Sequence, residues 1–169
     1  MNILAIDPGT KTGWAALCAR HIESGVQEFP LGRGDSPGMR YLRFRQWLGN
    51  LLDIAAPALV VYERPFMRGG YATEFLSALT SRIQEECAIR KIEYQAVNPA
   101  TLKKATTGTA KSDKTAMIVV ASERIGRPAR DDNEADAVNL LWLAMQENRQ
   151  TPPAPAGKNS KSAVTASVR

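Results

Sequence analysis

Short apolar runs alternate with longer amphipathic stretches along this chain. Five runs have the length and the apolar or alternating pattern of β-strands, and most are bounded by turn-forming residues: 2–7, 14–18, 25–29, 58–62 and 92–97. The run at 58–62 is wholly apolar, which is typical of a parallel strand buried on both faces. We therefore predict three antiparallel strands at the start of the domain and two further strands beyond them.

The longer stretches repeat their apolar residues every three or four positions, which predicts helices. They begin at or near Pro37, Thr73, Pro99, Ser112 and Asp131. Three strands followed by alternating helices and strands predict an α/β domain with a mixed five-stranded sheet and helices on both faces. Periodicity ends near residue 150, so we predict one domain over 1–150 and a disordered tail over 151–169 that is rich in Pro, Ala, Ser and Lys.

Composition narrows the classes of function only slightly. Lys and Arg outnumber Asp and Glu by 22 to 17, and the net charge of +5 suits a polyanionic partner, although solubility alone also explains such a charge. Cys18 and Cys87 lack metal-ligand spacing, which indicates free thiols in a reducing compartment and argues against zinc. The first residues enter a strand directly and no run reaches transmembrane length, so we expect a cytoplasmic protein.

Three carboxylates lie at the ends of apolar elements. Asp7 ends the first strand, Glu63 directly follows the strand at 58–62, and Asp136 lies in an apolar part of the last helix. A right-handed crossover places Glu63 beside the end of the first strand. Carboxylates in apolar surroundings need a balancing positive charge, and a set of oxygen ligands alone favours Mg²⁺ or Mn²⁺. Two such ions can activate water and stabilise the leaving oxygen of a phosphodiester.

Each carboxylate also has a simpler explanation. Asp7 could form a turn before Pro8-Gly9, and Glu63 could pair with Arg64 at the surface. Asp136 is the hardest to explain in this way because its neighbours in the helix are apolar. We interpret the three residues together as one metal site.

Three segments resemble motifs of the RuvC Holliday-junction resolvases. Ile3–Trp14 looks like the opening motif, a strand that ends in Asp-Pro-Gly and continues through a glycine into the next strand. Val60–Phe66 is similar to the second carboxylate motif, including an aromatic residue three positions after the glutamate, and Asn133–Ala137 resembles the motif of the final helix. Each motif alone is weak, but their order and spacing over residues 1–148 make the resemblance specific.

The resemblance implies an RNase H-like fold and a homodimer that nicks four-way DNA junctions in pairs. It also implies that Asp7, Glu63 and Asp136 bind two Mg²⁺ ions per active site, for which Mn²⁺ would substitute. The expected activity is that of a Mg²⁺-dependent endodeoxyribonuclease acting on branched DNA in a bacterial cell or a phage-infected host. No membrane and no small-molecule cofactor are expected.

The fourth ligand is the point where this chain departs from the family pattern. Three positions before Asp136 the family has an acidic residue or histidine, but this chain has Asn133. Either Asn133 binds through its carbonyl oxygen or Asp132 takes the place. We favour Asp132, because a fourth negative charge balances two divalent ions. Asp131 and Glu134 form a capping-box-like pair, so we expect Asp131 to be structural.

Two basic segments are predicted to contact DNA. Four lysines bracket a flexible segment at 106–110 and resemble the family's basic stretch: Lys103, Lys104, Lys111 and Lys114. Phosphate contact is the favoured interpretation, and a solvated face is the alternative. Arg64 and Arg68 flank Phe66, a combination that suits unstacked nucleotides at a distorted junction, although Phe66 could be ordinary core.

Three different functions compete with junction cleavage. An Asp-x-Gly-Thr turn also opens actin-like nucleotide-binding proteins, but those need a second such domain. An RNase H-like relative could process structured RNA, and a non-catalytic module could bind junctions without cutting them.

The apolar stripe from Phe75 to Cys87 could face a second subunit across a twofold axis rather than its own core.

Overall fold

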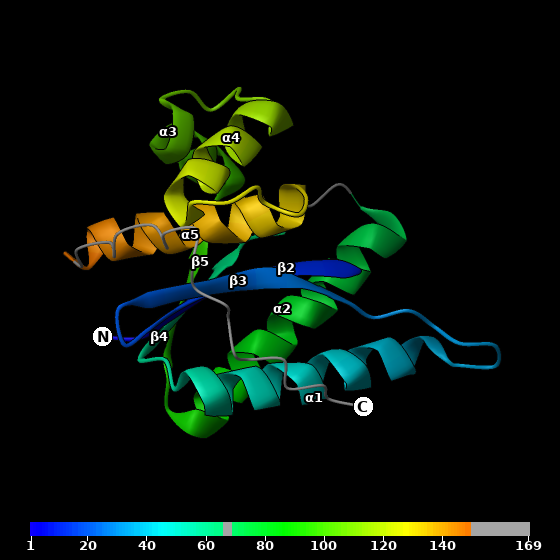
Figure 1. The fold of residues 1–169 in the computed structure, drawn as a ribbon. Helices are drawn as coiled ribbons and strands as arrows, with labels where there is room; N and C mark the ends of the chain where they lie inside the picture. The colour runs from blue at the N-terminus through cyan, green and yellow to red at the C-terminus, as the bar shows by residue number, and fades with distance from the viewer. Residues whose placement is uncertain (66–68, 150–169) are drawn as a thin grey trace.

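A computed structural model describes residues 1–65 and 69–149 of the chain. Within these residues, five strands form a single sheet (Figure 1): β1 (Ile3–Asp7), β2 (Lys11–Cys18), β3 (His21–Glu28), β4 (Leu59–Glu63) and β5 (Glu93–Val97). Their order in the sheet is β3-β2-β1-β4-β5. The strands β1, β2 and β3 are antiparallel, whereas β4 runs parallel to β1 and β5 parallel to β4. The mixed five-stranded sheet is as predicted.

Five helices of the described part of the chain cover the two faces of this sheet: α1 (Pro37–Ala55), α2 (Gly70–Arg90), α3 (Pro99–Thr107), α4 (Lys114–Ile125) and α5 (Asp132–Glu147). The helices α1 and α2 lie on one face, and α5 lies on the other with α3 and α4 beyond it (Figure 1). Alternate residues of β1 serve the two cores: Ile3 packs with α5, and Leu4 with α1 and α2. The described helices include none that is long and apolar enough to cross a bilayer.

Element boundaries differ from the predicted ones mainly at polar positions. β2 begins at Lys11 rather than Trp14, because Lys11 and Thr12 pair with Glu28 and Gln27 of β3. Hydrophobic patterning does not recognise polar residues of this kind as part of a strand. The predicted flexible segment at 106–110 is also shorter, because α3 continues to Thr107. The tail predicted at 151–169 lies outside the described residues.

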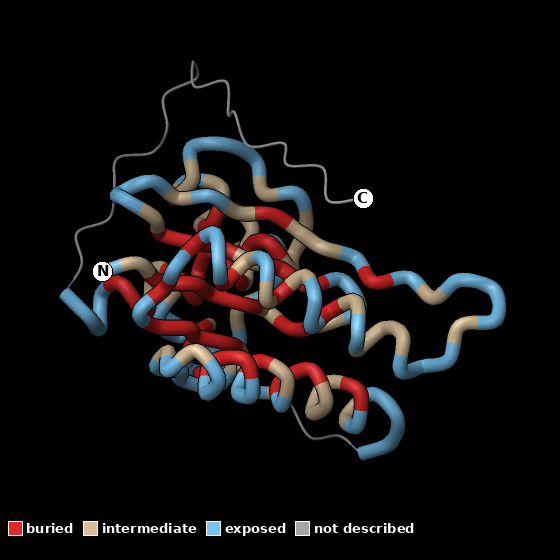
Figure 2. Tube along the Cα trace, turned by 90° about the horizontal axis from the view of Figure 1, so that it is seen from below, coloured by how far each residue is buried: buried red, intermediate tan, exposed pale blue. Residues whose placement is uncertain are grey.

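The apolar stripe of α2 belongs to the core of its own subunit. Phe75, Leu79, Ile83 and Cys87 are all 5% exposed or less and join the cluster formed with α1 and the sheet. Figure 2 shows this core as a band of buried residues in the interior. The interpretation that the stripe faces a second subunit is therefore wrong, and it no longer supports a dimer.

Candidate active site

The first two carboxylates meet at one edge of the sheet. Asp7 ends β1 and Glu63 ends the parallel neighbour β4. Ile6 and Tyr62 are partners in this ladder, so the next residues, Asp7 and Glu63, lie side by side at the same end of the sheet. Asp7 and Glu63 are half-buried, whereas the strand residues just before them are buried. The parallel pairing predicted from the sequence thus brings these two side chains together.

Helix α5 supplies the remaining acidic residues. Asp132 and Asp136 lie one turn apart and therefore share a side of the helix. A pocket between α5, α3 and α4 is lined by Glu63, Asp132 and Asp136, together with Lys103, Lys114, Pro99, Leu102 and Met117. Three of the four predicted acidic ligands thus line one pocket. The fourth, Asp7, lies close enough for its pKa to respond to all three of the others.

A close backbone contact lets α5 approach β1. Gly13 of β2 is the ladder partner of Asp7. A β-carbon on Gly13 would lie 1.9 Å from the backbone oxygen of Asn133, which is far inside any permitted contact. The first turn of α5 therefore packs directly on the backbone of β2. Gly13, the glycine that follows Asp-Pro-Gly in the sequence motif, is therefore needed for the close approach of this helix.

Burial, and after it mutual repulsion, disfavours the ionised form of the three carboxylates. Burial, followed by the charges of Glu63 and Asp136, raises the pKa of Asp7 well above its usual value. Burial and Asp136 raise the pKa of Glu63 to about 7, against the opposing effect of Lys103. Burial and Asp132 raise the pKa of Asp136 to about 6. Bound divalent cations would relieve this repulsion and favour the ionised carboxylates.

The donor set fits Mg²⁺ or Mn²⁺ in its chemistry, because it consists of carboxylate oxygens that lie close enough to raise one another's pKa. The ligand shell is not closed, however. Within residues 1–65 and 69–149, no three His, Cys, Asp or Glu side chains are grouped so that they could hold one ion as they stand. Binding would thus have to draw the carboxylates closer together.

The three residues at the start of α5 have different surroundings. Asp131 caps the helix by accepting a hydrogen bond from the backbone nitrogen of Glu134 (3.0 Å), so its structural role is confirmed. Asp132 lines the pocket and pairs with Lys114, which lowers the pKa of Asp132. Asn133 places its backbone oxygen against Gly13. Of the two candidates for the fourth ligand, Asp132 is the one that lines the pocket.

The predicted DNA-contacting residues fall into four groups. Lys103 and Lys114 line the pocket, whereas Lys104 and Lys111 are exposed outside it. Arg64 is exposed directly after Glu63, and the two residues form no ion pair in the part of the chain that the structure describes. Phe66 and Arg68 lie outside the described residues, so their predicted role stays a prediction.

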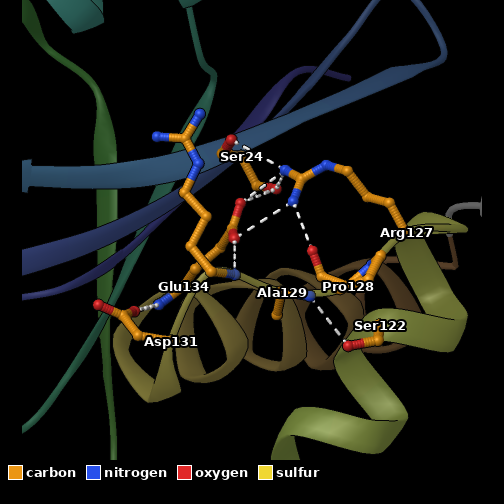
Figure 3. A network of polar contacts seen from close by, with 8 residues as sticks. Ser24, Ser122, Arg127, Pro128, Ala129, Asp131 and Glu134 are labelled. Carbon is orange, nitrogen blue, oxygen red and sulfur yellow. Dashed lines mark hydrogen bonds and ion pairs between the residues drawn. The ribbon is translucent and has the colours of Figure 1, made fainter.

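Glu134 has a larger role than the sequence indicated. Its side chain is fully buried and accepts hydrogen bonds from Ser24, Arg127 and the backbone of Arg130 (Figure 3). The capping-box spacing suggested only a local contact with Asp131. The signal that could have identified it is its position. Glu134 is a charged residue directly before Ala135, in a stretch whose apolar pattern predicts burial.

Comparisons with known proteins agree with the resemblance seen in the sequence. No family profile matches the chain. A crossover junction endodeoxyribonuclease RuvC from Corynebacterium efficiens is 28% identical over 153 residues, which make up 86% of this chain and 67% of that protein. The protein of the same name from Frankia alni is 26% identical over 153 residues, or 86% of this chain and 76% of that protein.

Solved structures show the same fold. Thermus thermophilus RuvC in complex with a Holliday junction substrate matches with a TM-score of 0.73 and 18% identity, over 87% of this chain and 96% of that one. Fowlpox virus resolvase, also solved with junction DNA, matches with a TM-score of 0.59 and 14% identity, over 88% and 99% of the two chains. The resemblance to RuvC and the RNase H-like fold are thus confirmed.

Proposed function

We propose that this chain is a structure-selective DNA endonuclease that resolves four-way junctions by metal-dependent hydrolysis of phosphodiesters. The observation that carries the proposal is the pocket in which Glu63, Asp132 and Asp136 face Lys103 and Lys114. Acidic and basic side chains in one pocket suit a substrate that carries phosphate together with divalent cations. The relatives named as junction endonucleases supply the substrate class.

Each group of residues has a distinct part in this function. Asp7, Glu63, Asp136 and Asp132 would hold two Mg²⁺ ions, or Mn²⁺ in their place, and these ions would supply an activated water and stabilise the leaving oxygen. Lys103 and Lys114 would hold the phosphate beside the carboxylates. The exposed Lys104 and Lys111 would contact the DNA backbone farther away, and Arg64, Phe66 and Arg68 would contact unstacked nucleotides.

The Lys114–Asp132 ion pair suggests a double role for Lys114 within this proposal. Lys114 is the charge partner of Asp132 in this structure. If Asp132 held a cation, the ammonium group of Lys114 would lose its partner and would be free to contact a phosphate oxygen. Lys114 would then balance the carboxylate in the metal-free site and the phosphate in the loaded one.

We also propose that the active species is a homodimer acting in the cytoplasm. Paired cuts in opposed strands need two active sites related by the twofold symmetry of the junction. Sedimentation in moderate salt should report about twice the chain mass of 18.4 kDa. A strict monomer at micromolar concentration that still resolves junctions would contradict the dimer.

The decisive experiment compares a synthetic four-way DNA junction with duplex DNA and structured RNA of equal length in Mg²⁺. The expected result is paired nicking of the junction only. Asp7→Asn, Glu63→Gln and Asp136→Asn should each abolish nicking and leave junction binding largely intact. Cleavage of RNA alone, binding without cleavage by the wild-type chain, or full activity of Asp7→Asn would each refute the proposal.

A further inference from the structure

We propose that Glu134 is a positioning residue that fixes the first turn of α5 on the sheet and thereby places Asp132 and Asp136 against Asp7. The inference rests on the proposed function for the role of those carboxylates. It adds a residue, distant from the reacting atoms, on which the affinity of the site for cations depends.

The contacts of Glu134 join three separate segments. Its Oε1 accepts from the Ser24 hydroxyl of β3 (2.8 Å) and from Nη2 of Arg127 (2.6 Å). Its Oε2 accepts from the backbone nitrogen of Arg130 (2.6 Å) and from Nη1 of Arg127 (3.3 Å). Each oxygen therefore has two donors, and the side chain is 0% exposed (Figure 3). Charge-assisted hydrogen bonds of this kind, away from water, define a geometry closely.

Arg127 extends the same network to the strand. Its Nη2 also donates to the Ser24 hydroxyl (2.9 Å) and to the Ser24 carbonyl (3.2 Å). The guanidinium group thus bridges the carboxylate of Glu134 and the backbone of β3. The connection between α4 and α5, the strand β3 and the helix α5 are held at one point.

The position of Glu134 on the helix relates this point to the active site. Glu134 is two residues from both Asp132 and Asp136, so it projects from roughly the opposite side of α5. The network therefore holds the helix from the side away from the pocket. Any shift or rotation of this first turn carries both aspartates with it. The Gly13–Asn133 contact limits how closely the helix approaches, and Glu134 fixes where along β3 it is held.

A second buried glutamate provides a matched control. Glu86 of α2 is 5% exposed and pairs with Arg45 (2.6 Å) and Arg90. It joins α2 to α1 on the opposite face of the sheet from α5. Removing the charge of Glu86 should cost stability in the same way, without affecting the aspartates of α5. The difference between the two variants isolates the positioning effect.

The test uses the full chain with Glu134→Gln and Glu86→Gln, both nearly isosteric. Thermal unfolding, Mn²⁺ binding by calorimetry without DNA, junction binding in Ca²⁺ and single-turnover nicking in Mg²⁺ are measured for each. Both variants should lose several degrees of thermal stability. Only Glu134→Gln should also lose roughly tenfold or more in Mn²⁺ affinity and in nicking rate, as expected for residues that orient ligands, with junction affinity unchanged.

Equal Mn²⁺ affinity in the two variants would overturn the inference. If Glu134→Gln does not fold, Ser24→Ala removes a single donor to the carboxylate and should weaken Mn²⁺ binding by a few-fold, and wild-type affinity in that variant would overturn the inference too. Failure of the proposed function looks different: the wild-type chain would bind Mn²⁺ and leave junctions uncut, while the Mn²⁺ comparison still decides the role of Glu134.

Discussion

The backbone of Gly13 lies directly beneath the backbone carbonyl of Asn133. A β-carbon at Gly13 would be 1.9 Å from the Asn133 oxygen and 3.0 Å from the Glu134 nitrogen. Because Gly13 also pairs with Asp7 across the β1–β2 ladder, one backbone contact ties the start of α5 to the strand that carries the first carboxylate. The separation between strand and helix is therefore set by a glycine.

Gly13→Ala should push α5 away from the sheet. Overpacking of this kind typically costs about 1–3 kcal/mol, and the shift should also reduce nicking because Asp132 and Asp136 move with the helix. Urea unfolding and single-turnover cleavage measure the two effects. The control is Gly38→Ala in α1, where the new β-carbon would meet only the Ser36 hydroxyl at 3.6 Å. That variant should be neutral or slightly more stable. Wild-type stability and activity in Gly13→Ala would refute the role of this contact.

Glu63→Gln should stabilise the metal-free protein at neutral pH and above. The folded-state pKa of Glu63 is raised from 4.5 to about 7, so the folded state binds its proton more tightly than the unfolded state does. Its ionisation therefore opposes folding, and the free energy of unfolding falls as pH rises from about 4.5 to about 7. The glutamine variant lacks this contribution.

Thermal unfolding of wild type and Glu63→Gln in EDTA, from pH 4 to pH 8, measures the effect. The stability difference should grow in favour of the variant across that window and then level off. Saturating Mg²⁺ should narrow the difference in stability. The ion stabilises the folded wild type more than the variant, because the variant lacks the Glu63 carboxylate. A pH-independent difference would show that Glu63 titrates normally.

Asp132→Asn should raise the Mg²⁺ concentration needed for half-maximal nicking. Asp132 lines the pocket and adds a negative charge there, and its amide would lose that charge. Asn133→Ala should change the requirement little, because the amide of Asn133 adds no charge to the site and Asn133 does not line the pocket. A Mg²⁺ titration of the cleavage rate separates the two. If Asp132→Asn cuts normally and Asn133→Ala fails, the fourth ligand is Asn133.

The four lysines should divide into two classes. Each one that touches a phosphate should reduce the log–log salt slope of binding by roughly 0.9 when replaced by alanine. Replacing the pocket residues Lys103 and Lys114 should also slow cleavage when the junction is saturating. Replacing Lys104 and Lys111 should weaken binding alone. Binding at several salt concentrations and single-turnover rates test this division. An unchanged slope after all four replacements would show that the lysines are solvated bystanders.

The sequence predicted the positions of the acidic residues well because those positions follow from local rules. An apolar run that ends in Asp7 and another that precedes Glu63 predict two buried strands, and the handedness of the crossover makes them neighbours. Asp131 was likewise identified as a cap from its spacing to Glu134. Each of these inferences needs only a short segment and a general rule of connection.

Features that depend on pairs of distant residues were not predictable in this way. Arg127 and Ser24 are far apart in sequence, and neither stands out before Glu134 is seen to join them. The stripe from Phe75 to Cys87 has the same pattern whether it faces a partner or a neighbouring helix, and only the packing of α1 decides between them. Amphipathic periodicity predicts that one face of a helix is buried, but it does not identify the element that packs against that face.

The order of the elements along the chain also determines when the site can form during synthesis. The carboxylates come from β1, from the later strand β4 and from α5, the last described helix. Contacts between such distant segments form late, after the intervening chain has been made and has collapsed. A growing or truncated polypeptide that lacks α5 therefore has only half of its acidic ligands. Under the proposed function, the nascent chain is harmless to the DNA around it until α5 is in place.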